Sequence, residues 1–566
     1  DHKALVSQAD LVYESPVERP VEGQPIGNGR MGTLVWTSPR AVHFQINRND
    51  VFAVNRNHVG AQFGPTDYCG GCASVVLDVG GQPFAAGKSF RQRLSLYDAE
   101  AHVAGAAVKV RCFVSSQTDV LVLEIDDQRL EPQQIRLTVS MWRAPEVVHG
   151  NHAARYRFSE SNDSVTIVQT FDEKDHHCAS AVAVRVGDEE TGRRGRQPGT
   201  DRKGWSASYR SVANGKARQE NRLSGACNVQ IERTGERSRS LVAPARRGKR
   251  IIFIASAASL GGEGGLGRTG LQARPQRETD GPGDPPYQAV SLLDAVERRS
   301  YDHLFEEHQR WWHKFWTRTF VRLKSEDGSA EAAQKVRYRH LYYMGSSSRG
   351  VLPPKWNGSL FATAGDQRKW GSQFWVWTTE MLYFPLLKAD AIDLTDPYFD
   401  MYVRQLPNCQ KAAQQRWGSR GAYFPETTAF DGPTVLPDDV AAEFQDVLLG
   451  RKKHTELSSR ADAMCRFDSH LRAATRPREG RYTWISHVAS SGSELAVQAW
   501  WRYRYTGDSE WLRTHAYPLL RGTVEFYRHL VKKGEDGRYH LSGTNSHEDF
   551  WGVTDGIMDL AAIRGT

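Results

Sequence analysis

Acidic and aromatic side chains gather in four loop-like segments in the second half of the 566-residue sequence, at 353–385, 416–432, 484–495 and 542–552. Cleavage of a glycosidic bond needs a carboxylic acid that protonates the leaving oxygen, usually with a second carboxylate. It also uses aromatic faces, against which the C–H patches of sugar rings pack. The segments therefore predict a sugar-cleaving site with Glu548 as the catalytic residue. The expected substrate-binding residues are Trp356, Asn357, Trp370, Trp375, Trp377, Glu380, Glu426, His487, Asn545, His547 and Trp551.

Three of the carboxylates differ in their sequence context. Glu548 lies in a polar loop flanked by His547 and Phe550–Trp551, where apolar cover favours the neutral acid that donates a proton. Glu380 precedes an apolar stretch and is equally compatible with a buried structural carboxylate. Glu494 opens a predicted helix, and a carboxylate there favours the positive end of the helix dipole, so we expect capping.

No other chemistry competes strongly. The sequence has no P-loop, no HExxH and no GxGxxG that opens a helix after a strand. The glycines of "GNGRMG" (27–32) precede a strand and predict a turn. Trp311, Trp312 and Trp316 have periodic apolar neighbours, which indicates core positions.

Short β-branched and aromatic runs from Ala4 to about Leu260, without intervening helices, predict an antiparallel β-sandwich. The most apolar run, Arg250 to Leu260, is too short for a membrane span and predicts a buried strand. Residues 261–287 are rich in Gly and Pro and predict a linker. The Arg-rich stretch 193–250 predicts a solvated loop or surface insertion.

After Gln288 the apolar period becomes helical. The first predicted helix covers 289–319, and Gly507 is a predicted helix C-cap. A succession of helices joined by aromatic-rich loops favours an (α/α)6-type barrel, incomplete within this sequence and closed beyond Thr566. The expected domains are 1–260 (sandwich), 261–328 (linker and linker helix) and 329–566 (first part of the catalytic barrel). Further helices are predicted at 330–346, 379–388, 398–415, 459–473, 493–506 and 510–533.

The bulk properties narrow the class of protein. The net charge of +8 is concentrated in the Arg-rich stretch, without a nucleic-acid fold signature, so we expect no nucleic-acid partner. Seven cysteines form no framework; for Cys69 and Cys72, free thiols are favoured over a local disulfide or zinc. The first residue is Asp1 rather than Met, which favours a processed protein in the periplasm or the extracellular space.

Several segments resemble glycoside hydrolase family 95, the α-L-fucosidase and α-L-galactosidase family. They are "QPIGNGRMGTLVW", "VHFQINRNDVF", "WNGSLF", "WGSQFWVWTTEMLYFP", "WGSRGAYFPETT", "RYTGDSEWLRTHAYPLLRGTVEFYRHLV" and "GTNSHEDFW", in that family's order. The resemblance implies a sandwich followed by a helical barrel, and inverting hydrolysis. It also implies that Glu548 occupies the general-acid position and that the general base lies in a later segment.

The family's Asn-x-Asn-x-Glu-Met pattern corresponds to 376–381 here, where neither asparagine is present. That difference supports an alternative, a catalytically silent carbohydrate-binding protein. A third alternative is a phosphorylase or polysaccharide lyase on the same scaffold. We expect no cofactor; calcium often supports such folds, but no ligand spacing identifies a site.

Overall fold

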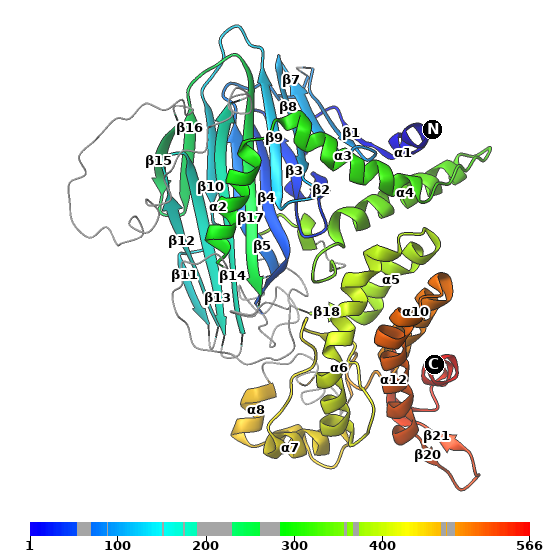
Figure 1. Ribbon diagram of the computed structural model, residues 1–566. Helices are drawn as coiled ribbons and strands as arrows, with labels where there is room; N and C mark the ends of the chain where they lie inside the picture. The colour runs from blue at the N-terminus through cyan, green and yellow to red at the C-terminus, as the bar shows by residue number, and fades with distance from the viewer. Residues whose placement is uncertain are drawn as a thin grey trace.

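A β-sandwich forms the N-terminal half of the structure, a computed structural model (Figure 1). The structure describes residues 1–53, 69–87, 89–149, 152–173, 176–188, 229–260, 284–355, 359–365, 373–465, 471 and 482–566. The neighbouring strands of its two sheets pair antiparallel, as the short β-branched runs predict.

One sheet has ten strands and the other has seven. In spatial order the first contains β1 (Leu11–Tyr13), β6 (Arg91–Ser95), β7 (Glu100–Gly105), β8 (Val108–Val114), β9 (Val120–Asp127), β17 (Gly248–Leu260), β14 (His176–Asp188), β13 (Ser164–Glu173), β12 (His152–Glu160) and β11 (Glu146–His149). The second contains β15 (Gln230–Gly235), β16 (Ser238–Ala243), β10 (Ile135–Ser140), β5 (Cys69–Asp78), β4 (Ala41–Phe52), β3 (Met31–Ser38) and β2 (Gln24–Gly27).

Strand β17 contains the apolar run predicted to be buried, and the prediction is confirmed. Its residues are buried on both faces because one face lies in the sandwich and the other is covered by helix α2 (Pro285–Glu297). Ile251 and Phe253 pack with Leu293 of that helix. A strand covered on both faces is apolar at successive positions rather than alternating.

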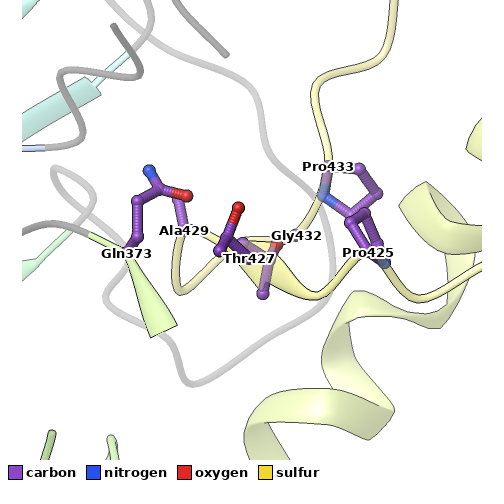
Figure 2. A pocket seen from close by; sticks show the side chains of 7 residues that line it. Gln373, Pro425, Thr427, Ala429, Gly432 and Pro433 are labelled. Carbon is purple, nitrogen blue, oxygen red and sulfur yellow. The ribbon is translucent and has the colours of Figure 1, made fainter. Parts of the chain in front are cut away.

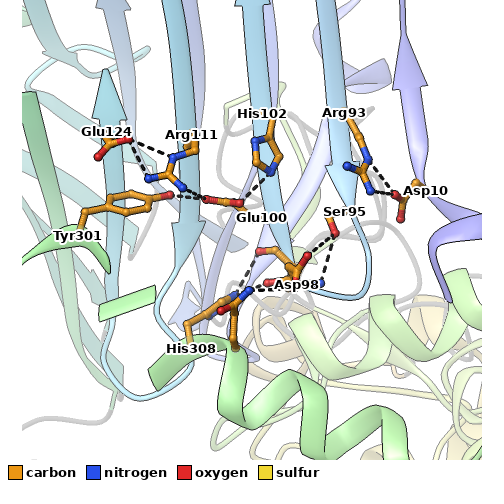
Figure 3. A network of polar contacts seen from close by, with 12 residues as sticks. Asp10, Arg93, Ser95, Asp98, Glu100, His102, Arg111, Glu124, Tyr301 and His308 are labelled. Atoms are coloured by element: carbon orange, nitrogen blue, oxygen red, sulfur yellow. Dashed lines mark hydrogen bonds and ion pairs between the residues drawn. The ribbon is translucent and has the colours of Figure 1, made fainter. Parts of the chain in front are cut away.

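Helix α3 (Tyr301–Thr317) packs on a face of the ten-stranded sheet and joins the helical part to the sandwich (Figure 3). The Tyr301 hydroxyl lies 2.6 Å from Glu100 Oε1, and His308 Nε2 lies 3.1 Å from the Asp98 carbonyl oxygen. The single helix predicted over 289–319 is therefore wrong. It divides at Ser300, whose Oγ accepts a hydrogen bond from the His303 backbone N–H and starts α3 as an N-cap.

The turn at 28–31 joins the sandwich to the end of helix α4 (Ser329–Ser347). Gly29 N–H donates to the Ser346 carbonyl oxygen at 2.8 Å, and Asn49 Nδ2 donates to the Ser347 carbonyl oxygen at 2.6 Å. Gly29 has φ 87°, and a Cβ there would lie 2.3 Å from the Cβ of Arg349. The predicted turn is confirmed, and its glycine allows two segments to approach closely.

The remaining helices follow the predicted order, with differences at their ends. The predicted helix at 510–533 contains a π-helical turn at Leu512–Ala516, and a helix at Asp438–Leu448 was not predicted. Gly507 ends α10 at φ 68°, as predicted. The helices are α1 (His2–Val6), α5 (Val376–Lys388), α6 (Asp396–Trp417), α7 (Asp438–Leu448), α8 (Ser459–Cys465), α10 (Ser491–Thr506), α11 (Ser509–Trp511), α12 (Tyr517–Leu530) and α13 (Ile557–Gly565). Short strand pairs accompany them: β18 (Phe374–Trp375) with β19 (Thr427–Thr428), β20 (Lys532–Lys533) with β21 (Tyr539–His540), and β22 (Ser542–Ser546) with β23 (Phe550–Thr554).

Several predictions concern surfaces and cysteines. Trp312 and Trp316 are fully buried, as predicted. Cys72 is a buried free thiol, so the disulfide alternative is wrong, whereas the Cys69 side chain lies outside the described residues. The end of the Arg-rich stretch forms β15 and β16 rather than a loop, because these strands extend the edge of the second sheet.

Residues 189–228 of the Arg-rich stretch and 261–283 of the predicted linker lie outside the description. No helix in the described part of the chain is long and apolar enough to cross a membrane. The domain limits and the export of the protein stay predictions.

Candidate active site

Glu426 lies against the first turn of helix α5. The pairing of β18 with β19 brings the two segments together, and the Val376 N–H donates to the Glu426 carbonyl oxygen at 3.0 Å. The Trp377 N–H lies 3.4 Å from Glu426 Oε1. Trp377 itself is 45% exposed, so its indole is open to a ligand beside this carboxyl.

The tip of the β22–β23 hairpin lies next to Trp377. The His547 ring centroid is 5.8 Å from that of Trp377, in an edge-on arrangement. Glu548 follows His547 and is half-buried, and its charge contributes to the raised pKa of Glu426. The hairpin, the start of α5 and the segment before β19 thus bring Glu548, Trp377 and Glu426 to one place.

The aromatic shelter predicted for Glu548 is only partly present. Phe550 is 67% exposed and Trp551 is 42% exposed, because both lie on the outer part of the hairpin. Trp551 Nε1 donates to the Glu548 carbonyl oxygen at 2.7 Å, so this indole folds back against the backbone of the tip. The contribution predicted for Phe550 is wrong.

Two predicted substrate-binding residues have the contacts of structural residues. Asn545 is buried; its Nδ2 donates to the carbonyl oxygens of Thr483 (2.6 Å) and Ser486, and its Oδ1 accepts from the Gly552 N–H at 3.1 Å. His487 is fully buried, with Nε2 2.9 Å from the Leu448 carbonyl oxygen. These contacts anchor the hairpin and its neighbouring loop, and they give no support to direct contact with substrate.

Three carboxyl groups lie beneath this surface. Glu380 on α5 is 2% exposed, and burial, with Glu494 and Glu426 nearby, raises its pKa to about 9. Burial and the charge of Glu494 raise the pKa of Glu426 to about 8, although its Oε2 accepts a 2.9 Å hydrogen bond from Ser491 Oγ. Burial also raises the pKa of Glu494. Glu380 and Glu426 are therefore mainly uncharged at neutral pH.

The neighbouring polar side chains were missed by sequence reasoning. Tyr398 and Tyr402 on α6 are fully buried; their hydroxyls, like Gln498 Oε1 on α10, have no hydrogen-bond partner among the described residues. Burial raises the pKa of both hydroxyls. The charges of Glu380 and Glu494 raise that of Tyr398 further, and those of Glu426 and Glu380 raise that of Tyr402. The i, i+4 spacing of Tyr398 with Tyr402 and of Glu494 with Gln498 was the available signal, because it puts each pair on one helix face.

Glu494 occupies the first turn of α10, where capping was predicted, and it accepts a 2.9 Å hydrogen bond from Ser490 Oγ. Its Oε2 is buried without a hydrogen-bond partner in the described residues. Glu494 therefore belongs to the buried carboxyl cluster as well as to the helix end. Within the described ranges, no group of three or more His, Cys, Asp and Glu side chains is arranged to hold a metal ion.

Of the other predicted substrate-binding residues, the structure describes Trp375. Trp375 is 5% exposed and stacks on Trp484 at 5.1 Å between ring centroids, which is a core position. Trp356, Asn357 and Trp370 lie outside the described residues.

A small pocket next to Glu426 contains no acidic side chain (Figure 2). It is lined by Gln373, Pro425, Thr427, Thr428, Ala429, Gly432 and Pro433. Because it lacks a titratable group, the candidate acid chemistry belongs to the neighbouring carboxyl groups.

Comparison with known families agrees with this arrangement. The sequence model of the glycosyl hydrolase family 95 catalytic domain matches residues 445–559, which include Glu548. Over this segment the chain is similar to glycosyl hydrolase family 95. A domain of unknown function, DUF5703, matches residues 12–186 of the sandwich.

The curated relatives of this family 95-like protein include different enzymes. Kojibiose hydrolase of Flavobacterium johnsoniae is 22% identical over 50% of this chain and 33% of the relative. Alpha-L-fucosidase 2 of Arabidopsis thaliana is 22% identical over 50% and 32%, and kojibiose phosphorylase of Halothermothrix orenii is 23% identical over 47% and 30%. The matches thus span about a third of the length of these relatives.

The fold also has a solved counterpart. A putative kojibiose phosphorylase from the human microbiome superposes with a TM-score of 0.57 at 10% identity, over 99% of this chain and 65% of that one. Its likeness confirms the fold class, a β-sandwich followed by a helical-barrel domain.

Proposed function

We propose that this family 95-like protein is a glycoside hydrolase that removes terminal sugars, with Glu548 as the general acid of an inverting reaction. The observation that carries the proposal is the meeting of Glu548, Trp377 and Glu426 from three separate segments, one of them within the family 95 match. The similarity of residues 445–559 to a sugar-cleaving family supports a carbohydrate-active enzyme, and the site supplies an acid and an aromatic face for the reaction.

Each residue has a role that follows from its exposure. Glu548 is half-buried at the tip of a hairpin, where it can meet the oxygen between two sugars and donate a proton to it. The exposed indole of Trp377 offers a face for a sugar ring. Because Glu380 and Glu426 are mainly neutral, they add little negative charge beneath a substrate.

An inverting reaction also needs a base that activates water on the opposite face of the sugar. The two carboxyl groups of such a pair lie about 6.5–9.5 Å apart. We propose that the base comes from a segment following Thr566, as the resemblance implies.

Replacing Glu548 by Gln in the full-length protein tests the proposal. Hydrolysis of a glycoside with a poor leaving group is expected to fall about 10²- to 10⁴-fold because the amide cannot donate the proton, while sugar binding is retained. Asp549→Asn is the matched control, because it makes the same chemical change at the exposed neighbouring position and should leave turnover unchanged. Unchanged turnover in Glu548→Gln would remove this residue from the role.

A phosphorylase is the second candidate, because kojibiose phosphorylase is among the relatives. Turnover that depends on inorganic phosphate and releases a sugar phosphate would favour it over the hydrolase. Binding of sugars without product from any aryl glycoside or glycan would instead favour a catalytically silent protein.

A further inference from the structure

The base of the β22–β23 hairpin contains a fully buried hydrogen bond. Thr544 Oγ1 on β22 donates to Asp559 Oδ2 on helix α13 at 2.6 Å, and both residues are 0% exposed. Asp559 Oδ1 has no hydrogen-bond partner among the described residues. Burial raises the pKa of Asp559 to about 6. Such a carboxyl is costly to bury, and Thr544 is the side chain that compensates for part of that cost.

This hydrogen bond connects the hairpin to helix α13, which packs against α10. Thr566 Oγ1, just after α13, donates to Ser493 Oγ on α10 at 2.7 Å, and α10 also carries Glu494. On the other side of Thr544, Asn545 holds the hairpin to the loop at 483–487. The strand that leads to Glu548 is thus held from two directions.

We propose that Asp559 is a positioning residue for Glu548: its hydrogen bond with Thr544 fixes the hairpin so that Glu548 lies beside Trp377 and Glu426. This inference rests on the proposed function, in which Glu548 is the acid. Asp559 acts through Thr544 and not on the substrate.

Comparing kcat on substrates with good and poor leaving groups distinguishes a displaced Glu548 from a general loss of structure. A phenyl glycoside has a poor leaving group and needs the proton, whereas a 2,4-dinitrophenyl glycoside of the same sugar leaves without it. In the full-length protein, Asp559→Ala and Thr544→Val should lower kcat on the phenyl glycoside about 10- to 100-fold, as expected for a small displacement. On the dinitrophenyl glycoside their kcat should be unchanged, as for Glu548→Gln.

Two conservative variants complete the test. Thr544→Ser keeps the hydroxyl donor and Asp559→Asn keeps an oxygen acceptor, so both should retain most of the activity on the phenyl glycoside. Equal losses on both substrates in Thr544→Val would overturn the inference and assign the pair a structural role. If Glu548→Gln loses the same activity on both substrates, or none on either, the proposed function itself fails. If Glu548→Gln loses activity only on the phenyl glycoside and Thr544→Val does not, only the positioning role fails.

Discussion

Glu380 illustrates how burial decides what a carboxyl group does. The sequence was equally compatible with a structural and a site role for Glu380. In the structure this residue is buried, with Glu426 and Glu494 nearby. A buried carboxyl without a positive partner is held in its neutral form, since desolvation and like charges both penalise the anion. Its Oε2 has no hydrogen-bond partner among the described residues, so Glu380 keeps an unused hydrogen-bonding atom beneath the site.

Glu380→Gln is therefore expected to change the pH dependence of stability. The pKa of Glu380 rises from its ordinary value of 4.5 to about 9 in the folded protein. Between those values the folded state binds more protons than the unfolded state. The contribution of Glu380 to stability is therefore complete below pH 4.5 and is lost as the pH rises toward 9. Gln stays neutral, so the variant should lose less Tm than the wild type between pH 5 and pH 8.5.

Thermal denaturation across that range measures the effect. Glu426 titrates in the same window, so part of the wild-type slope should remain in the variant. Glu535→Gln, at an exposed position of the same domain, should reproduce the wild-type slope. Identical slopes for Glu380→Gln and Glu535→Gln would contradict the assignment of a raised pKa to Glu380.

At the scale of elements, the β22–β23 hairpin decides where the proposed acid lies. A two-stranded hairpin is marginal on its own, and this one depends on side-chain contacts at its base. Asn545 supplies several of these contacts, and its backbone N–H also donates to the His487 carbonyl oxygen at 3.0 Å. The same residue would be expected in a sugar site by its type alone.

Asn545→Ala should lower the free energy of unfolding by about 2–4 kcal/mol, because the carbonyl groups of Thr483 and Ser486 and the Gly552 N–H each lose a buried hydrogen bond. Ser542→Ala on the exposed end of the same strand should change it by less than about 0.5 kcal/mol. Urea denaturation measures both. Equal, small effects would contradict the anchoring role.

At the scale of the whole molecule, the sandwich and the helical part meet at the turn 28–31 and the end of α4. Two of the segments that resemble family 95 form this junction. Gly29 in "QPIGNGRMGTLVW" and Asn49 in "VHFQINRNDVF" each donate a hydrogen bond to a backbone carbonyl group at the end of α4. These hydrogen bonds hold the end of α4 against the sandwich.

Gly29→Ala should disrupt this junction. The new Cβ would lie 2.3 Å from Arg349 Cβ, at a backbone φ of 87°. Gly507→Ala is the control: it has φ 68° but open space around it, so it should lose only about 1–2 kcal/mol from backbone strain. Calorimetry should show a larger fall in Tm for Gly29→Ala, with the single transition broadening or dividing into two. A loss equal to that of Gly507→Ala would show that the junction tolerates the contact.

The sequence by itself determined the local structure of this protein. Strand and helix periods, the turn at 28–31, the C-cap at Gly507 and the core positions of Trp312 and Trp316 depend on near neighbours along the chain, and the structure confirms them. The break at Ser300 and helix α7 were missed although local signals existed, a serine N-cap and two acidic residues after Pro437.

Only the tertiary structure decided which polar residues form the site. Nothing in the sequence brings Glu380, Glu426 and Glu494 together, and their proximity comes from the packing of α5, α10 and the segment before β19. Asn545 and His487 became anchors for the same reason. Desolvation and charge–charge effects depend on distances in space, and no period or motif along the chain encodes them.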